Sequence, residues 1–257
     1  MNTNVLLKKL GRLFPKKIAV ANHDFVGLMV GKLPLEVKSI VLCLDYDRFV
    51  YDYLKNNSIK PDLIITHHPF IYGKKKDVFL RDHHKKSLYD KTVSDDFVVY
   101  SFHTNFDGGN GGMNDTLAKL LELNDIKPLE NEPIARGGVL KNPMTFNDLV
   151  LYVKDRLNVK TIKTVRGNNE IIKSVAIIGG GGASYFRVSQ DAGYDLFISG
   201  DARHSTRRDI LIYEYNYFDV AHEVERIFMS RMAEIIDEID SDIRITIIDH
   251  EEEPEIL

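Results

Sequence analysis

An internal repeat constrains the fold of this chain more than any other feature of its sequence. Three apolar stretches of the first half have counterparts in the second half: KSIVLCLD (38–45) with KSVAIIGG (173–180), DLIITHH (62–68) with DLFISGD (195–201), and FVVYSFH (97–103) with YFDVAH (217–222). The first two pairs begin 135 and 133 residues apart, and the closing histidines of the third pair, His103 and His222, are 119 residues apart. Three matches in the same order favour an internal duplication, and therefore two related halves.

The repeated stretches have the pattern of buried β-strands, and helical patterns lie between them. The expected helices cover RFVYDYLKNN (48–57), much of 82–92, NDTLAKLLEL (114–123) and TFNDLVLYVKDRL (145–157). Asn114 and Thr145 are the expected N-caps of the last two helices, and a short amphipathic helix closed by Pro15 is expected at the N-terminus. This alternation predicts the α/β class, with two related halves of mostly parallel sheets.

The boundary between the halves is expected near 126–138, where proline, glycine and charged residues are frequent. We therefore expect a first α/β half over 1–125 and a second over 126–257. The C-terminal stretch predicts one more strand before an acidic end, and this strand and the helix before it can pack back onto the first half. In both halves polar residues gather at the carboxyl ends of the strands, where open α/β sheets bind their ligands.

Composition excludes several classes of function. The net charge is −4, from 34 basic and 38 acidic residues spread along the chain, which argues against a dedicated nucleic-acid surface or a footprint on anionic membranes. No apolar run approaches the roughly 18 to 20 residues of a membrane span. Cys43 is the only cysteine, so it has no partner for an internal disulfide and is expected to be buried. The N-terminus lacks a signal-peptide cleavage pattern, and we expect a cytoplasmic protein.

His67 and His68 end the second predicted strand. Adjacent strand residues point to opposite faces of a sheet, so two neighbouring imidazoles rarely converge on one ion. As the strand opens into a loop before Pro69, each imidazole can serve a different ion of a pair. The alternative is one packed and one exposed histidine.

A second cluster follows the third predicted strand, in SFHTNFDGGNGGMND (101–115). His103 and Asp107 lie there in a glycine-rich loop, which can turn tightly and approach a ligand. Asp107 is a candidate bridging carboxylate, because imidazole and carboxylate ligands suit Zn, Fe, Mn or Ni. The alternative for Asp107 is a turn residue bonded to its own backbone.

The third cluster is AHEVERIF (221–228), where a strand runs into a helix. His222 and Glu225 are three residues apart and share one face of a helix, whereas Glu223 points elsewhere. The alternative is a helix start whose acid is favoured by the helix dipole. Because the three clusters occupy equivalent strand ends, together they predict a dinuclear metal site.

Other motifs point less clearly to a function. IIGGGGAS (177–184) opens a helix after a strand, and Asp201 follows about 20 residues later. This spacing is an imperfect match to a dinucleotide-binding fingerprint. The Gly179–Gly182 loop can still bind a phosphate or another anion. Asp201 and His204 can line the same site. RDHHKK (81–86) is expected to be a solvated helix face.

DLIITHHPFIY, SFHTNFD followed by GGMNDTLAKLLEL, ISGDARH and AHEVERI resemble, in this order, the motifs of the GTP cyclohydrolase 1 type 2 homologue family, also called NIF-three-like dinuclear metal proteins. The resemblance runs from about residue 22 to 230. It implies two related α/β halves, a dinuclear metal site in the cleft between them, and a toroidal homohexamer, a trimer of dimers. Carried over residue by residue, the implied metal ligands are His67, His68, Asp107, His222 and Glu225, with His103 at or beside the site.

This resemblance implies two divalent ions per chain (Zn, Fe, Mn or Ni) and a metal-dependent hydrolase that acts on a small molecule. In the reaction of the family name, activated water attacks C8 of a purine nucleotide and opens its imidazole ring. His103 or Glu223 is then the proton carrier. The alternative is a non-catalytic, metal-holding or partner-binding ring protein, whose metals would be saturated by protein ligands.

One segment departs from the family pattern. ANHDFVGLMVG (21–31) has His23 and Phe25 where the family has tryptophan and asparagine, and it keeps Asp24 and Gly27. If this loop selects the ligand, the resemblance implies the metal site but not the substrate.

Overall fold

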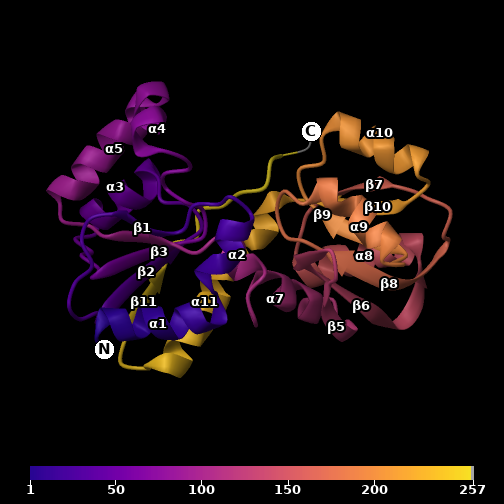
Figure 1. The fold of residues 1–257 in the computed structure, drawn as a ribbon, viewed down its shortest axis with the longest axis horizontal. Coiled ribbons are helices and arrows are strands. Elements are labelled where there is room, and N and C mark those ends of the chain that lie inside the picture. The colour runs from indigo at the N-terminus through magenta and orange to yellow at the C-terminus, as the bar shows by residue number, and fades with distance from the viewer. Residues whose placement is uncertain (256–257) are drawn as a thin grey trace. The chain divides into compact units, whose positions relative to one another are not determined.

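A computed structural model describes residues 1–255, and its chain divides into two compact units. The first unit comprises Met1–Asn110 and Phe228–His250, and the second comprises Gly111–Ile227 and residues 251–255. Each unit is built around its own β-sheet (Figure 1).

The first unit has a five-stranded sheet with the strand order β1-β4-β3-β2-β11. Its strands are β1 (Gly27–Val30), β2 (Ser39–Cys43), β3 (Leu63–Thr66), β4 (Val99–Ser101) and β11 (Arg244–Ile247). All neighbours pair in parallel except β1, which lies antiparallel to β4. The parallel core of this sheet confirms the predicted class.

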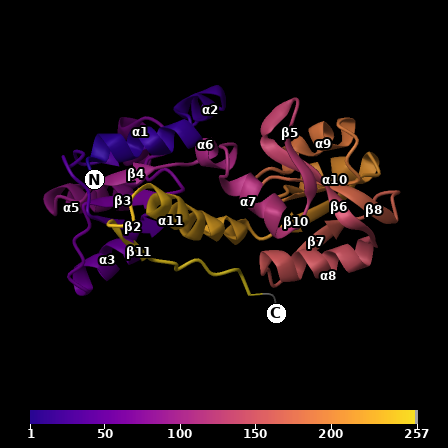
Figure 2. The same cartoon turned by 90° about the horizontal axis from the view of Figure 1, so that it is seen from below.

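Helices cover both faces of the first sheet. They are α1 (Thr3–Leu13), α2 (Lys16–Ala21), α3 (Arg48–Asn56), α4 (Lys75–Arg81), α5 (His83–Ser94), α6 (Thr104–Asp107) and α11 (Ile227–Ile239). Helices α1 and α11 lie on one face of the sheet, and α3 and α5 lie on the other (Figures 1 and 2). Cys43 is fully buried in the core between the sheet and α3, as expected.

The second unit has a six-stranded sheet with the order β5-β6-β8-β9-β10-β7. Its strands are β5 (Asn124–Leu129), β6 (Glu132–Thr145), β7 (Ile162–Val165), β8 (Ile171–Ile177), β9 (Leu196–Ser199) and β10 (Asn216–Val220). Strands β8, β9 and β10 are parallel, and the other three pair antiparallel. The helical segments are α7 (Met113–Leu120), α8 (Phe146–Leu157), η1 (Ala183–Tyr185), α9 (Phe186–Asp191), α10 (His204–Ile212) and η2 (His222–Arg226).

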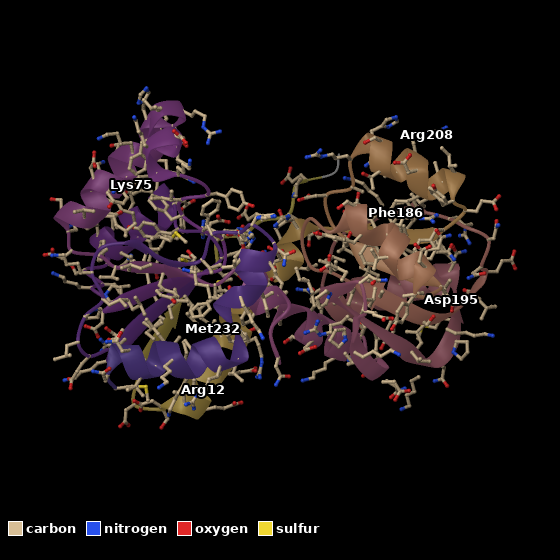
Figure 3. The ribbon with its side chains drawn as sticks, in the orientation of Figure 1. Arg12, Lys75, Phe186, Asp195, Arg208 and Met232 are labelled. Atoms are coloured by element: carbon tan, nitrogen blue, oxygen red, sulfur yellow. The ribbon has the colours of Figure 1, made fainter. Side chains whose placement is uncertain are left out.

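The two sheets share a hydrogen-bonded detail that supports the duplication. The Asp62 carboxylate accepts bonds from the backbone N–H groups of Lys38 and Ser39 and from the Ser39 hydroxyl, at 2.8 to 2.9 Å. The carboxylate of Asp195 (labelled in Figure 3) accepts the same three bonds from Lys173 and Ser174, at 2.9 to 3.2 Å. Each aspartate directly precedes one parallel strand and ties it to the neighbouring strand, Asp62 to the start of β2 and Asp195 to the middle of β8.

Replacing either aspartate should destabilise the protein by a similar amount. Asp62→Ala and Asp195→Ala each remove an acceptor of three hydrogen bonds, at a cost of about 2 to 4 kcal/mol in the free energy of unfolding. The measurement is urea denaturation. The control is Asp90→Ala, which breaks only an exposed ion pair with Lys86 and should cost less than about 0.5 kcal/mol.

The effect at Asp62 should also depend on pH. Burial raises the pKa of Asp62, but its hydrogen bonds with Lys38 and Ser39 lower the pKa by more. The net pKa therefore lies below the usual value. A depressed folded-state pKa gives stability that is present above the unfolded-state pKa and lost as pH falls through the folded one. The stability difference between wild type and Asp62→Ala should therefore shrink in acid, and an unchanged difference would contradict this assignment.

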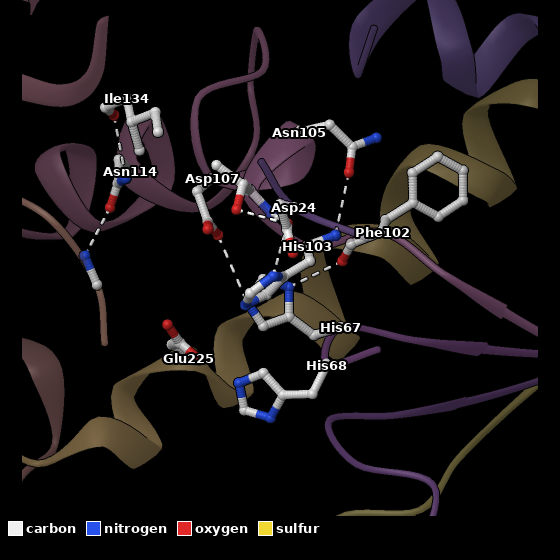
Figure 4. Close-up of polar contacts among 12 residues, drawn as sticks. Asp24, His67, His68, Phe102, His103, Asn105, Asp107, Asn114, Ile134 and Glu225 are labelled. Atoms are coloured by element: carbon white, nitrogen blue, oxygen red, sulfur yellow. Dashed lines mark hydrogen bonds and ion pairs between the residues drawn. The ribbon is translucent and has the colours of Figure 1, made fainter. Parts of the chain in front are cut away.

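Several local predictions can be compared with the structure. Thr145 is the N-cap of α8, and its hydroxyl accepts a bond from the Asp148 N–H, as predicted. Asn114 is not an N-cap, because α7 begins at Met113 and its N-cap is Gly112. Asn114 is fully buried, and its side chain joins the Ile134 carbonyl to the Gly179 N–H (Figure 4).

The segment 126–138, where the sequence predicts the boundary, forms β5 and the first part of β6. The triplet Asp82–His84 is exposed at the start of α5, as predicted, and Asp82 caps that helix. Within residues 1–255, no helix is both long and apolar enough to cross a membrane.

Candidate metal centre

In the first unit, the chain turns sharply after β3 and brings two adjacent imidazoles together. The backbone N–H groups of His67 and His68 both donate to the Leu44 carbonyl, at 3.1 and 3.0 Å. Two successive amides cannot bond one acceptor in a regular strand, where they point to opposite sides. The two ring centroids consequently lie only 5.0 Å apart.

His103 joins this pair from the end of β4. Its ring centroid lies 5.0 Å from that of His67 and 5.6 Å from that of His68. One ring nitrogen from each of the three histidines lies within 4.8 Å of the others. Asp107, at the end of α6, places a carboxylate oxygen 3.4 Å from the His67 Nε2 (Figure 4). These four side chains form what we call the first ligand set.

Each imidazole of the first ligand set is held through its Nδ1 atom. The Nδ1 of His67 is 2.9 Å from the Phe102 carbonyl oxygen. The Nδ1 of His68 is 2.7 Å from an Asp45 oxygen, and the Nδ1 of His103 is 2.7 Å from an Asp24 oxygen. Metal-binding histidines typically donate their second ring N–H to such acceptors, which orients the other nitrogen toward the metal.

The carboxylates behind these imidazoles favour the ionised state. Burial raises the pKa of Asp24 and of Asp45, but hydrogen bonds and charge attraction from His103 and His68 lower it more. The net pKa of each carboxyl is below its usual value, so both are anionic near neutral pH. An anionic acceptor raises the basicity of the imidazole that it holds.

The first ligand set has a buried and an open side. His67 is fully buried, with its ring centroid 5.2 Å from that of Phe228 and 6.3 Å from that of Phe106. The His68 side chain keeps 22% of its exposure and that of His103 keeps 24%. A ligand can therefore approach from the side of His68 and His103, while His67 is fixed by packing.

A second ligand set, His222 and Glu225, lies in the second unit. Both belong to η2, where the His222 Nε2 is 3.0 Å from a carboxylate oxygen of the buried Glu225. The His222 Nδ1 is 2.7 Å from an Asp201 oxygen. The hydrogen bond with Glu225 is the main cause that raises the pKa of His222 to about 9, and the bond with Asp201 adds to it.

Gly180 allows Glu225 to occupy this position. Its φ is +62°, in the left-handed region, and a Cβ added there would overlap the Glu225 carboxylate. Two backbone N–H groups of the loop that contains Gly180 are already bonded within the protein. The Gly179 N–H donates to Asn114 and the Gly182 N–H to the Gly180 carbonyl. These bonds favour a packing role over the anion site that the glycine pattern suggested.

Two of the three remaining candidates, Glu223 and Asp201, lie beside His222. Glu223 is half-buried and lines a pocket of about 270 Å³ together with His222, Asp201 and Lys163. His204 is exposed at the start of α10. Asp201, proposed only as a cleft residue, orients His222.

Sequence reasoning missed the role of Asp45. This residue ends the stretch KSIVLCLD, and Asp201 ends the counterpart of the following strand, DLFISGD. An acid at the carboxyl end of a parallel strand was the available signal, because that edge also carries the histidines.

Replacing these orienting carboxylates should weaken metal binding without removing a ligand. Asp45→Asn and Asp201→Asn should each lower metal affinity by about 10- to 100-fold, the usual effect of losing such a partner. Competition with a chelator measures it. Asp47→Asn is the matched control, because Asp47 caps α3 and asparagine caps equally well. Equal affinities in all three variants would contradict the assigned roles.

Comparison with known proteins gives the family. A model of the Duf34/NIF3 (NGG1p interacting factor 3) family matches residues 1–254. A GTP cyclohydrolase 1 type 2 homolog of Clostridium perfringens is 31% identical over 239 residues, which are 90% of this chain and 90% of that protein.

Two solved structures share the fold. A Bacillus cereus protein related to NIF3 has a TM-score of 0.86 at 18% identity, covering 100% of this chain and 99% of the other. A Staphylococcus aureus protein has a TM-score of 0.86 at 22% identity, with the same coverage. With a family match over residues 1–254 and a relative 31% identical, the chain belongs to the Duf34/NIF3 family.

Proposed function

We propose that the chain is a dinuclear metal protein that acts as a metal-dependent hydrolase. Its two divalent ions would be held by His67, His68 and Asp107 of the first unit and by His222 and Glu225 of the second. The observation that carries this proposal is the common support of the imidazoles. His67, His68, His103 and His222 each have Nδ1 within 2.9 Å of an oxygen acceptor, the arrangement typical of metal-ligating histidines.

The donor chemistry fits a divalent transition metal. Imidazole nitrogens and carboxylate oxygens suit Zn, Fe, Mn or Ni, and the two oxygens of Asp107 allow it to bridge two ions. No thiolate takes part, because Cys43 is buried within β2. His103 lies as close to His67 and His68 as a ligand would, so it can complete the coordination or carry a proton.

The proposed chemistry is hydrolysis. A pair of bound divalent ions lowers the pKa of coordinated water and supplies a nucleophile at neutral pH. Asp24 holds the Nδ1 of His103, which leaves its Nε2 to take up or deliver a proton at the open side of the set. Glu223 is a second candidate proton carrier, because it lines the pocket beside His222.

We propose a purine nucleotide as substrate and a ring opening of the GTP cyclohydrolase type 2 kind. The name of the Clostridium perfringens relative supports this choice.

We further propose a cytoplasmic homohexamer, a trimer of dimers, for which native mass measurement should give about six chains. A clean monomer would contradict that assembly.

Turnover of GTP by metal-loaded protein tests the proposed function. The purine absorbance and chromatography of the products would be followed for wild type, Asp107→Asn and the control His84→Ala, whose histidine is exposed on α5. We expect conversion by wild type and His84→Ala and its loss in Asp107→Asn. If metal-loaded wild type converts neither GTP nor other purine nucleotides, the hydrolase proposal fails and a metal-holding ring protein remains.

A further inference from the structure

The first unit has a pocket beside the first ligand set, at the segment that departs from the family pattern. It has a volume of about 290 Å³. Its apolar wall comes from the turn before β1, from β1 itself and from the segment after β3, and consists of Phe25, Val26, Leu28, Met29 and Ile71. Asp24 connects this wall to the ligand set. One of its carboxylate oxygens accepts a bond from the Phe25 N–H, and the other is bonded to the His103 Nδ1.

Two exposed aromatic rings stand beside this pocket. Phe25 and Tyr72 are 40% and 57% exposed, and their rings meet edge to face at 5.5 Å. Tyr72 also lies edge to face with His103, with ring centroids 6.4 Å apart. The flat faces of these exposed rings suit contact with a planar ring system.

The charge around the pocket favours an anion. Lys16 and Lys75 line it and are both exposed. The Lys75 ammonium sits 3.6 Å from the centre of the Tyr89 ring, which holds it in place. Asp24 is the acidic residue of the lining, and its carboxylate already accepts bonds from Phe25, His103 and Thr104.

We propose that this pocket binds a planar aromatic ring system that carries an anionic group, as a nucleotide does. Phe25 and the apolar wall would contact the ring, and Lys16 and Lys75 would contact the anionic group. The inference rests on the proposed function, since it assigns the residues that would bind the proposed nucleotide beside the first ligand set. It assigns a specificity role to Phe25 and to Lys75.

Calorimetric titration tests the proposal with three probes, guanosine 5′-monophosphate, guanosine and inorganic phosphate. Both metal-loaded and metal-stripped protein would be titrated. Guanosine 5′-monophosphate should bind more tightly than either fragment. Phe25→Ala should weaken its binding about tenfold, because stacking on an aromatic side chain is lost. Lys75→Gln should weaken the monophosphate several-fold and leave guanosine unchanged.

Phe49→Ala is the matched control, because Phe49 is a similarly exposed aromatic residue on α3 and outside this pocket. The proposal is overturned if the monophosphate does not bind, or if Phe25→Ala and Phe49→Ala bind it equally. Metal content of the variants should stay unchanged. Selective loss in Phe25→Ala, without turnover by the metal-loaded wild type, would refute the hydrolase proposal and leave this pocket standing.

Discussion

His68→Ala should lose metal and keep its stability, whereas His67→Ala should lose metal and also be destabilised. His68 is partly exposed and contributes its ring to the open side of the first ligand set. Its loss should lower metal affinity by at least about 100-fold, more than the loss of an orienting partner. His67 is fully buried against Phe106 and Phe228. Its replacement leaves a cavity and removes the hydrogen-bond partner of the Phe102 carbonyl. Together these losses should cost about 2 to 4 kcal/mol of stability.

Metal content and thermal unfolding of the metal-free proteins measure these two effects separately. His84→Ala is the control for both, since its histidine is exposed on α5. Collapse of the His68→Ala fold would mean that this side chain supports the core. Full metal occupancy in that variant would remove it from the ligand set.

Gly180→Ala is expected to disable the second ligand set. The left-handed φ of +62° strains alanine by about 1 to 2 kcal/mol. The new methyl group would also overlap the Glu225 carboxylate and lie 3.2 Å from the His222 ring. Glu225 must then move away from His222, so we expect a total loss of about 2 to 4 kcal/mol in stability and strongly weakened metal binding.

Gly181→Ala provides a closely matched control. A Cβ at that position meets nothing nearer than 3.7 Å, and its φ is not positive. We expect this variant to keep wild-type stability and metal content, as judged by urea denaturation and elemental analysis. Equal behaviour of the two variants would show that Glu225 does not need its observed position.

The parallel part of both sheets could be predicted from the sequence. Strands β2, β3, β4, β9 and β10 and the second half of β8 are short, mostly buried runs, and such runs stand out from helical periodicity. The repeat also gave their order and placed histidines after the carboxyl ends of β3, β4 and β10.

The antiparallel strands could not be predicted in the same way. Strand β6 contains Pro133, Gly137, Gly138 and Pro143, which normally indicate turns. In the structure the Tyr194 ring packs directly on Gly137, so that a Cβ there would overlap it. The glycine serves a close tertiary contact, which local sequence cannot distinguish from a turn.

Only part of the candidate site could be predicted from the sequence, because tertiary contacts also determine its geometry. Strand alternation predicts that His67 and His68 diverge, yet their amides share the Leu44 carbonyl and their rings converge. The partners Asp24 and His103 are 79 residues apart in the chain, and Asp201 and His222 are 21 apart. Such pairings arise from the fold, so residue types gave the ligands and tertiary structure gave their orientation.

The central claim is that this chain holds two divalent ions. The most direct measurement is metal content per chain by plasma mass spectrometry, on protein purified without chelator or nickel affinity resin. The double variant His68→Ala/Glu225→Ala serves as the reference for nonspecific metal. The account predicts about two ions per wild-type chain and close to none in the double variant. Wild-type protein that stays empty after reloading with Zn, Fe, Mn and Ni would contradict it, and the histidines would then be packing residues.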